Sequence, residues 1–295
     1  MQALWMILAS FMFATMGVGV KLASSHFNVF ELVLYRGLVG MVFMALIVRA
    51  RGSSLRTRFA GMQAWRSLTG VISLLAWFYA IANLPLATAM TLNYMSSIWV
   101  ATFLIGGALV YARGPGQPRQ GLLMLTVLAG FGGVVMILRP TLEQNQLFAG
   151  LIGLMSGLVA ALAYLQVTAL GRVGEPEERT VFYFALGSAL GGGIGVVFTG
   201  LSEWSWQAAV WLLPIGVLAS IGQWCMTRAY SQGPTLVAAN LQYSGIVFAA
   251  LYGLLLFGDQ IPLLAWLGML VIVVSGVVAT ALRTQTLPNP PAEEH

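Results

Sequence analysis

Two stretches of the sequence carry aromatic, amide and hydroxyl side chains at the same spacing, about half a chain apart. The first is WFYAIANLPLATAMTLNYMSSIW, from Trp77 to Trp99, and the second is MTRAYSQGPTLVAANLQYSGI, from Met226 to Ile246. When the two are aligned, the matching pairs are Asn83 with Gln232, Pro85 with Pro234, Asn93 with Gln242 and Tyr94 with Tyr243. Such side chains donate and accept hydrogen bonds and offer ring faces to a cation. They can therefore bind a polar or zwitterionic small molecule.

The candidate substrate-binding residues are the polar and aromatic side chains in these stretches and on the segments expected to face them. They are Trp77, Tyr79, Asn83, Thr91, Tyr94, Trp99, Tyr164, Gln223, Asn240 and Tyr243. A polar group without a partner is costly in hydrocarbon, so each either bonds a neighbouring helix or contacts a ligand. Both interpretations stay open for any single residue. The pairs Thr91 with Asn240 and Tyr94 with Tyr243 are the strongest candidates for substrate contact.

Three charged residues, Arg36, Glu31 and Asp259, are candidates for gating or for electrostatic attraction. Arg36 lies inside an apolar run about one turn from Glu31, so it either forms a structural ion pair, extends to the surface or attracts a carboxylate. Glu31 and Asp259, with Lys21, are expected at the membrane surface. There they either gate the pathway or are simply solvated.

Catalysis needs a base, a nucleophile or a metal set, and the apolar segments supply none of these. The only histidines are His26 and His295, the only cysteine is Cys225, and no acid lies deep in an apolar run. A Gly-Lys-Ser/Thr phosphate loop is also missing. We therefore expect no enzyme, no metal, no cofactor and no direct use of ATP.

The elements that must position these residues are membrane helices. Of the 295 residues, 59% are hydrophobic and 8% charged, against about 45–50% and 25% in soluble domains. The net charge is +5, but Lys and Arg flank apolar runs, which is typical of membrane topology and not of nucleic-acid binding. Ten runs approach the roughly 20 residues that a spanning helix needs: Gln2–Leu22, Val29–Val48, Trp65–Ala82, Leu86–Val110, Gln120–Leu138, Ala149–Leu170, Thr180–Gly200, Ala208–Tyr230, Thr235–Phe257 and Pro262–Leu282.

The repeated stretch divides these runs into two halves. Because each half would hold five helices, an odd number, the second half enters the membrane from the opposite face. The sequence thus predicts an all-α integral membrane protein, with ten transmembrane helices as two inverted five-helix repeats, residues 1–140 and 147–283, and a disordered cytoplasmic tail, residues 284–295. Inverted repeats are typical of secondary transporters, with the substrate site near the bilayer midplane. The distribution of basic residues places both termini in the cytoplasm.

Small residues recur every four positions in two of the expected helices. They are Ala149, Gly153, Gly157 and Ala161 in one, and Gly187, Gly191 and Gly195 in the other. Such stripes let helix backbones approach closely in a membrane. We favour static packing within one half of the chain; a sliding surface and a dimer interface are the alternatives.

The segment Gly233 to Val278, with its acidic turn Gly258-Asp259, resembles the closing segment of EamA-type proteins of the drug/metabolite transporter superfamily. Arg36 stands where such proteins often carry an arginine, while Tyr111-Ala112-Arg113-Gly114 replaces the acidic turn of the first half. The resemblance implies a ten-helix metabolite exporter of a bacterial plasma membrane. One subgroup, the YddG-like carriers, exports amino acids, including aromatic ones.

These observations predict a monomeric exporter of neutral, including aromatic, amino acids or similar small metabolites. An aromatic, amide-rich cavity with little charge suits a zwitterion, whereas phosphorylated solutes need Lys or Arg there, for which only Arg36 is a candidate. Since no acid occupies the midplane, we expect facilitated diffusion down the substrate gradient. The alternative is a proton-coupled antiporter of cationic drugs.

Overall fold

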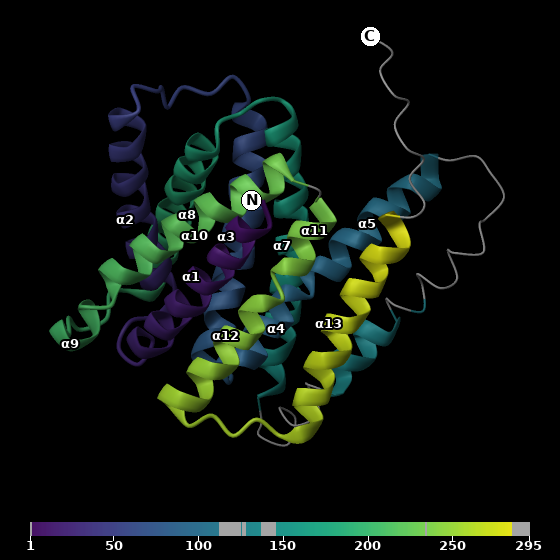
Figure 1. Ribbon diagram of the computed structural model, residues 1–295. Helices are drawn as coiled ribbons and strands as arrows, with labels where there is room; N and C mark the ends of the chain where they lie inside the picture. The colour runs from purple at the N-terminus through teal and green to yellow at the C-terminus, as the bar shows by residue number, and fades with distance from the viewer. Residues whose placement is uncertain (1, 112–124, 126–127, 137–145, 234, 285–295) are drawn as a thin grey trace, which may run out of the picture.

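The computed structural model describes residues 2–111, 125, 128–136, 146–233 and 235–284 of the chain (Figure 1). Within these residues the protein is a bundle of helices joined by turns, without strands. Seven of the helical segments are long and apolar enough to cross a membrane. The all-helical prediction is therefore confirmed for the described part of the chain. The count of ten spans stays a prediction.

The helix bounds follow most of the expected runs. The long helices are α1 Gln2–Ala23, α2 Val29–Ala50, α3 Ala60–Asn83, α7 Leu147–Arg172, α8 Glu177–Thr199, α10 Leu212–Gln232 and α13 Leu263–Thr284. The shorter ones are α4 Leu86–Tyr94, α5 Ser96–Tyr111, α9 Trp206–Ala209, α11 Thr235–Leu241, α12 Ser244–Tyr252 and the π-helical η1 Gly253–Phe257. Most of the expected run 120–138, residues 112–114 of the first-half turn and the tail after 284 lie outside the described residues.

Helix α3 begins at Ala60, well before the expected start at Trp65. Its first turn contains Gly61 and Gln63, which lower the hydropathy although the backbone is already helical. As a result Arg66 lies inside the helix and is buried, whereas Lys and Arg residues that flank apolar runs are expected at a membrane surface.

Two of the expected spans are interrupted where the repeated sequence carries its tyrosines. The run from Leu86 divides into α4, which ends at Tyr94, and α5, while the run from Thr235 divides into α11 and α12 around Tyr243. The amide of Tyr243 bonds the carbonyl three residues earlier, on Asn240, at 3.1 Å, and the amide of Ile246 does the same to Tyr243 at 3.0 Å. Such tightened turns inside a helix are common at hinges and functional sites.

The core is built from contacts between the two halves of the chain. Helix α1 packs on α10, α2 on α8, and α3 on α7, while α4 contacts α12 and α5 contacts α11. The approach of α2 and α8 is close, because a Cβ at Gly192 would meet the carbonyl oxygen of Phe30 at 2.7 Å. In Figure 1, α13 lies beside α5 along one edge of the bundle.

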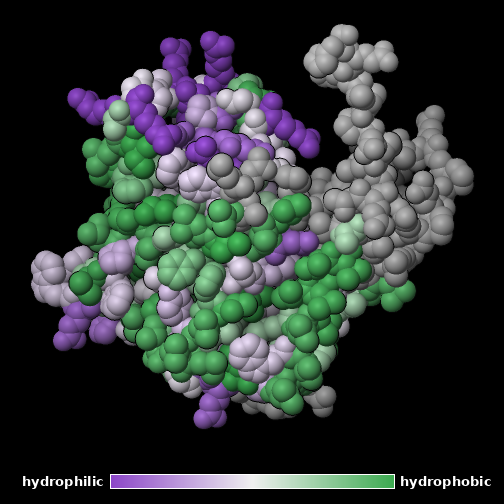
Figure 2. Space-filling view, viewed as in Figure 1, coloured by the Kyte–Doolittle hydropathy of each residue, from purple (hydrophilic) through white to green (hydrophobic). Residues whose placement is uncertain are grey.

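The surface divides into an apolar belt and two polar ends. Figure 2 shows hydrophilic side chains gathered at one end, where the loop between α2 and α3 carries Arg51, Arg56 and Arg58. We call this the basic end. There Arg51 pairs with Glu178 of α8. The apolar belt includes exposed residues such as Leu46, Ile72, Leu190, Ile194 and Val197, which suits contact with lipid.

Candidate functional site

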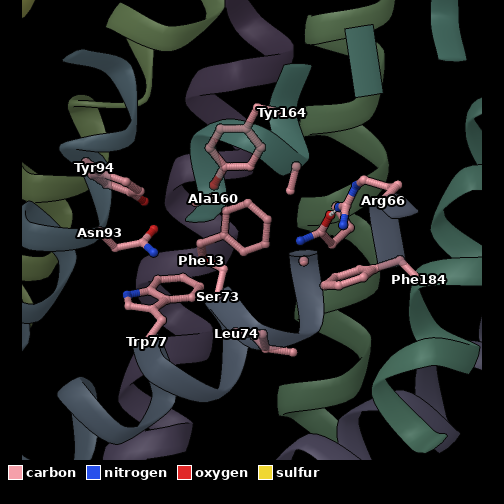
Figure 3. A pocket seen from close by; sticks show the side chains of 13 residues that line it. Phe13, Arg66, Ser73, Leu74, Trp77, Asn93, Tyr94, Ala160, Tyr164 and Phe184 are labelled. Atoms are coloured by element: carbon pink, nitrogen blue, oxygen red, sulfur yellow. Dashed lines mark hydrogen bonds between the residues drawn. The ribbon is translucent and has the colours of Figure 1, made fainter. Parts of the chain in front are cut away.

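A cavity of about 30 Å³ lies at the centre of the bundle, between helices of both halves of the chain (Figure 3). Its walls come from α1, α3, α4, α7, α8 and α10. This is room for a few water molecules at most, whereas small-molecule sites usually measure about 300–1,000 Å³. The cavity is therefore too small for a metabolite in this structure and must widen to admit one.

One wall of the cavity is aromatic and carries unused hydrogen-bond donors. Tyr94 at the end of α4 and Trp77 of α3 are buried, and neither the Tyr94 hydroxyl nor the Trp77 Nε1 has a partner among the described residues. In Figure 3 both side chains lie on the same side of the cavity, opposite Arg66 and Phe184. Buried polar atoms nearly always have partners, so these two donors are available to a ligand.

Next to this wall lies a pair of tyrosines, Tyr164 and Tyr230, that a shared glutamine holds by hydrogen bonds. The ring of Tyr164 stacks on that of Tyr230, with centroids 5.1 Å apart and planes 21° apart. Gln242, in the turn between α11 and α12, donates to the Tyr164 hydroxyl at 3.2 Å and accepts from the Tyr230 hydroxyl at 3.2 Å. The interruption of the second expected span thus positions the amide that orients both tyrosines. Gln242 was recognised only as the repeat partner of Asn93, not as a site residue.

Asn93 is fixed by α7. Its Nδ2 donates to the Ser156 hydroxyl at 3.0 Å, and Ser73 of α3 donates to the Ser156 carbonyl at 2.9 Å. Gly157 makes this possible, because a Cβ there would lie 2.6 Å from the carbonyl oxygen of Leu92. These hydrogen bonds therefore hold helices α3, α4 and α7 together beside the cavity.

The opposite wall carries Arg66, which is 2% exposed. Its Nη2 donates to Oε1 of Gln223 on α10 at 3.3 Å, and its guanidinium carbon lies 4.2 Å from the centre of the Phe184 ring. Its Nε and Nη1 have no partner in the described part of the protein. Gly70, one turn further along α3, leaves space for the guanidinium, since a Cβ there would collide with Nη1.

Arg36 of α2 lies on the same aromatic ring, with its guanidinium carbon 5.0 Å from the Phe184 centroid. Its Nη1 donates to the Ser188 hydroxyl at 3.3 Å, and its Nε has no described partner. The ion pair with Glu31 that the sequence suggested does not form. The Glu31 carboxylate instead accepts from the backbone amides of Asn28 at 2.8 Å and Ser202 at 2.9 Å, so it caps α2 and fastens the turn before α9.

The structure brings four of the ten candidate substrate-binding residues to the cavity, namely Trp77, Tyr94, Tyr164 and Gln223. The other six are not among the residues that line it: Tyr79, Asn83, Thr91, Trp99, Asn240 and Tyr243. Three of these contact other residues instead. Thr91 donates to the carbonyl of Ala87 at 2.7 Å, Asn83 donates to that of Tyr79 at 2.8 Å, and the Trp99 ring packs on Phe131.

Arg66 is a site residue that the sequence pattern does not identify, because an arginine beside the start of an apolar run is usually a topology signal. The signal that could have found it is its position after the helix-compatible residues Ala60 to Trp65. The statement that only Arg36 could place a cation near the cavity is therefore wrong.

At the end opposite the basic end, Asp259 joins three segments. Both of its carboxylate oxygens lie 3.1 Å from Nζ of Lys21 at the end of α1, and Oδ2 accepts from the backbone amide of Leu86, the first residue of α4, at 3.1 Å. The two charged side chains are only 19% and 12% exposed. Asp259 is therefore a partly buried connection, which we call the latch, and not a solvated surface charge.

The arrangement can bind and orient a ligand by hydrogen bonds and charge. Within the described residues no group of three or more His, Cys, Asp or Glu side chains could hold a metal ion. The acids found there lie at helix ends or in turns, as Glu31 and Asp259 do.

Comparison with known proteins gives a family and several relatives. Residues 1–139 match the EamA-like transporter family. The pseudopaline exporter CntI of Pseudomonas aeruginosa is 31% identical over 281 residues, which cover 94% of this chain and 95% of the exporter. A riboflavin transporter of Rhizobium johnstonii is 24% identical over 279 residues, covering 90% of this chain and 86% of that protein.

A solved crystal structure shares the fold. It superposes with a TM-score of 0.69 at 17% identity and covers 97% of this chain and 99% of its own. An uncharacterised transporter of Helicobacter pylori is 28% identical over 281 residues, covering 92% of each chain. The relatives named here are membrane transporters and not enzymes.

Proposed function

Because the chain belongs to the EamA-like transporter family, we propose that it is a secondary transporter that exports a small polar metabolite through the central cavity, with amino acids as the first candidates. The observation that carries this proposal is the cavity itself. It lies between helices of both halves and is lined by Tyr94, Trp77 and Arg66, each of which has a polar atom without a partner in the described part of the chain. A buried site of this kind, in an apolar bundle, suits a solute that must be held away from lipid.

The pattern of helix contacts supports two inverted repeats, residues 1–140 and 147–283. If α1, α2 and α3 correspond to α7, α8 and α10, exchange of the halves turns the contact of α1 with α10 into that of α7 with α3. The same exchange leaves the contact of α2 with α8 unchanged. Repeats of this type rock against each other in alternating access.

The latch supports a cycle in which one end of the bundle opens at a time. Lys21 and Asp259 hold the end of α1 against the start of α4. We place the basic end in the cytoplasm, with both termini, since basic residues favour that side. The latch then closes the outer mouth, and its release opens the cavity outward across a bacterial inner membrane. A monomer suffices for this cycle.

Relatives are named for export of pseudopaline and for transport of riboflavin, so the family fold serves more than one solute. Proton-coupled antiport of cationic drugs, the alternative, is disfavoured by Arg66 in the cavity wall, because a buried cation repels another.

The test is uptake by liposomes that contain the purified protein. Labelled amino acids of neutral, anionic and cationic types should enter protein-containing liposomes faster than empty ones, and reversal of the gradient should reverse the flux. A variant with Gly153→Leu, which forces a large side chain against Ala80 and Leu92, is the inactive control. Equal rates with and without protein for every class of solute would refute the function.

A further inference from the structure

Two arginines are buried at the centre of the bundle without a counter-ion among the described residues. Arg36 is 4% and Arg66 is 2% exposed. The ion pairs found within the described residues join Lys21 to Asp259, Arg51 to Glu178 and Arg179 to Glu175, so neither buried arginine takes part in one. Both guanidiniums lie against the single ring of Phe184.

Such an arrangement is unfavourable unless something else supplies negative charge. Desolvation of an ion is costly, and a buried charge without a partner is among the most destabilising features a core can hold. The Phe184 ring face attracts cations but replaces only part of the lost solvation. Water in the cavity can accept from the free N–H groups, yet it cannot neutralise the charge. Arg66 lies in the cavity wall, so an anion that enters the cavity can supply this charge.

We propose that the cavity is selective for anionic metabolites and that Arg66 binds an oxyanion, a carboxylate or a phosphate, of the transported solute. Guanidinium is the group best suited to this task, since its five N–H donors form paired bonds to such oxygens. Gln223 accepts from Nη2 at 3.3 Å, while Nε and Nη1 have no partner among the residues that the structure describes. Arg36, behind Phe184, adds positive potential without lining the cavity.

The side of the cavity that faces Arg66 can bind the part of the solute that does not carry the anion. Facing Arg66 across the cavity, the Tyr94 hydroxyl and Trp77 Nε1 have no described partner, so they can bond a second polar group. Phe13 and Leu74 supply apolar surface. The inference rests on the proposed transport function and changes its substrate class, from neutral zwitterions to solutes with net negative charge.

Matched solutes test the selectivity directly. Binding to the purified full-length protein is followed by tryptophan fluorescence with three pairs: glutamate and glutamine, succinate and succinamide, glycerol 3-phosphate and glycerol. At least one charged member should bind tenfold more tightly than its neutral partner. Preference in the first two pairs assigns a carboxylate, and preference in the third assigns a phosphate. Equal binding within all three pairs overturns the proposal.

Substitution of Arg66 tests the residue. Arg66→Gln should reduce the tenfold preference to less than threefold, Arg66→Lys should keep part of it, and Arg58→Gln, on the exposed loop, should leave it unchanged. Because Arg66→Gln removes an uncompensated charge, the ligand-free protein should unfold at the same or a higher temperature. The rise in unfolding temperature that the anion gives the unsubstituted protein should be lost. A folded Arg66→Gln variant with full anion preference refutes the assignment.

Gly70→Ala provides a second variant in case Arg66→Gln does not fold. The added methyl group takes the space of Nη1 without removing the charge, so anion preference should fall while the arginine is retained.

The transport function and the anion site can be refuted independently of each other. Anion binding without any flux into liposomes would refute transport but not the site, and flux of neutral solutes without anion preference would do the reverse.

Discussion

Tyr94 ends α4 with its hydroxyl buried and without a described partner. Tyr94→Phe should leave the free energy of unfolding unchanged or raise it by up to about 1 kcal/mol, because it removes a buried polar group that has no hydrogen bond. Transport at low substrate concentration should nevertheless fall about twofold to thirtyfold, the equivalent of one hydrogen bond of roughly 0.5–2 kcal/mol to the solute. Liposome flux and thermal unfolding measure the two quantities.

Thr91→Ala is the matched control, since the Thr91 hydroxyl bonds its own helix. Its transport should stay within about twofold of the unsubstituted protein, because the lost bond is local. A parallel loss of transport in both variants, with a parallel loss of stability, would make Tyr94 part of the structural packing only.

At the same scale, sequence reasoning found the tyrosine side of the cavity better than the arginine side. Tyr94, Tyr164 and Gln223 stand out because polar residues are rare in apolar runs. Arg66 did not, because an arginine near the start of a run is usually a topology signal. Whether Thr91 faces a ligand or its own helix depends on rotation of the helix, and the sequence does not determine that rotation to within one residue.

At the scale of helices, the stripes of small residues form contacts between the two halves of the chain. The prediction that they pack within one half is therefore wrong. Gly153 and Gly157 of α7 face Leu92 of α4, and Gly187 and Gly191 of α8 face Ser67 and Val71 of α3. Periodicity predicts a close helix contact but does not name the partner helix. The partner follows from the way the two halves fit together.

Gly157→Ala should separate α7 from the end of α4. Its methyl group would lie 2.6 Å from one backbone carbonyl and 2.8 Å from the next, and backbone cannot move as freely as a side chain. Overpacking of this kind costs about 1–3 kcal/mol, which thermal unfolding would detect. The control is Gly61→Ala at an open position of α3, where alanine should stabilise by up to about 1 kcal/mol. Equal stability of the two variants would contradict the close approach.

The latch yields a prediction that concerns three helices together. Asp259→Asn keeps an acceptor for the amide of Leu86 but leaves Lys21 without its carboxylate, so stability should fall by about 1–3 kcal/mol. The double variant Lys21→Met with Asp259→Asn should recover part of this loss. Thermal unfolding of the singles and the double measures the coupling, and Glu203→Gln, an exposed acid near the same end, serves as control. Additive losses would show that the two side chains are independent.

For the whole molecule, orientation can be measured by labelling. In a Cys225→Ala background, a single cysteine at Ser53 of the basic end should react only after the membrane is made permeable. Single cysteines at Ser25 and Glu203 should react with impermeant reagents in intact cells. These positions are exposed, so absence of labelling reflects the membrane and not burial. The opposite pattern would invert the proposed topology.

Coupling to protons is a second property of the whole molecule. A pH gradient acts on a carrier only through groups whose protonation changes between its states. In the described residues the acids lie at helix ends and in turns. A gradient of one pH unit should therefore change uptake less than about twofold, against the tenfold available from full one-proton coupling. Uphill accumulation that depends on pH and is abolished by Glu31→Gln would assign coupling to that acid.

Composition and run length were enough to predict a helical membrane protein, because the bilayer sets the length and polarity of every span. The fit of α1 on α10 or α2 on α8 was not predictable from these, since it depends on side-chain shape across segments far apart in sequence.

Export of an anion, which the buried charges of Arg36 and Arg66 favour, makes the voltage across the membrane a source of work. A solute that carries one net negative charge outward moves down the electrical gradient of a cell whose interior is negative. Each 100 mV is worth about 2.3 kcal/mol for one elementary charge, roughly fiftyfold in the concentration ratio at equilibrium. Such a carrier exports its metabolite against a rising outside concentration without ATP and without an acid in the middle of the described spans, and depolarisation of the membrane removes this electrical contribution.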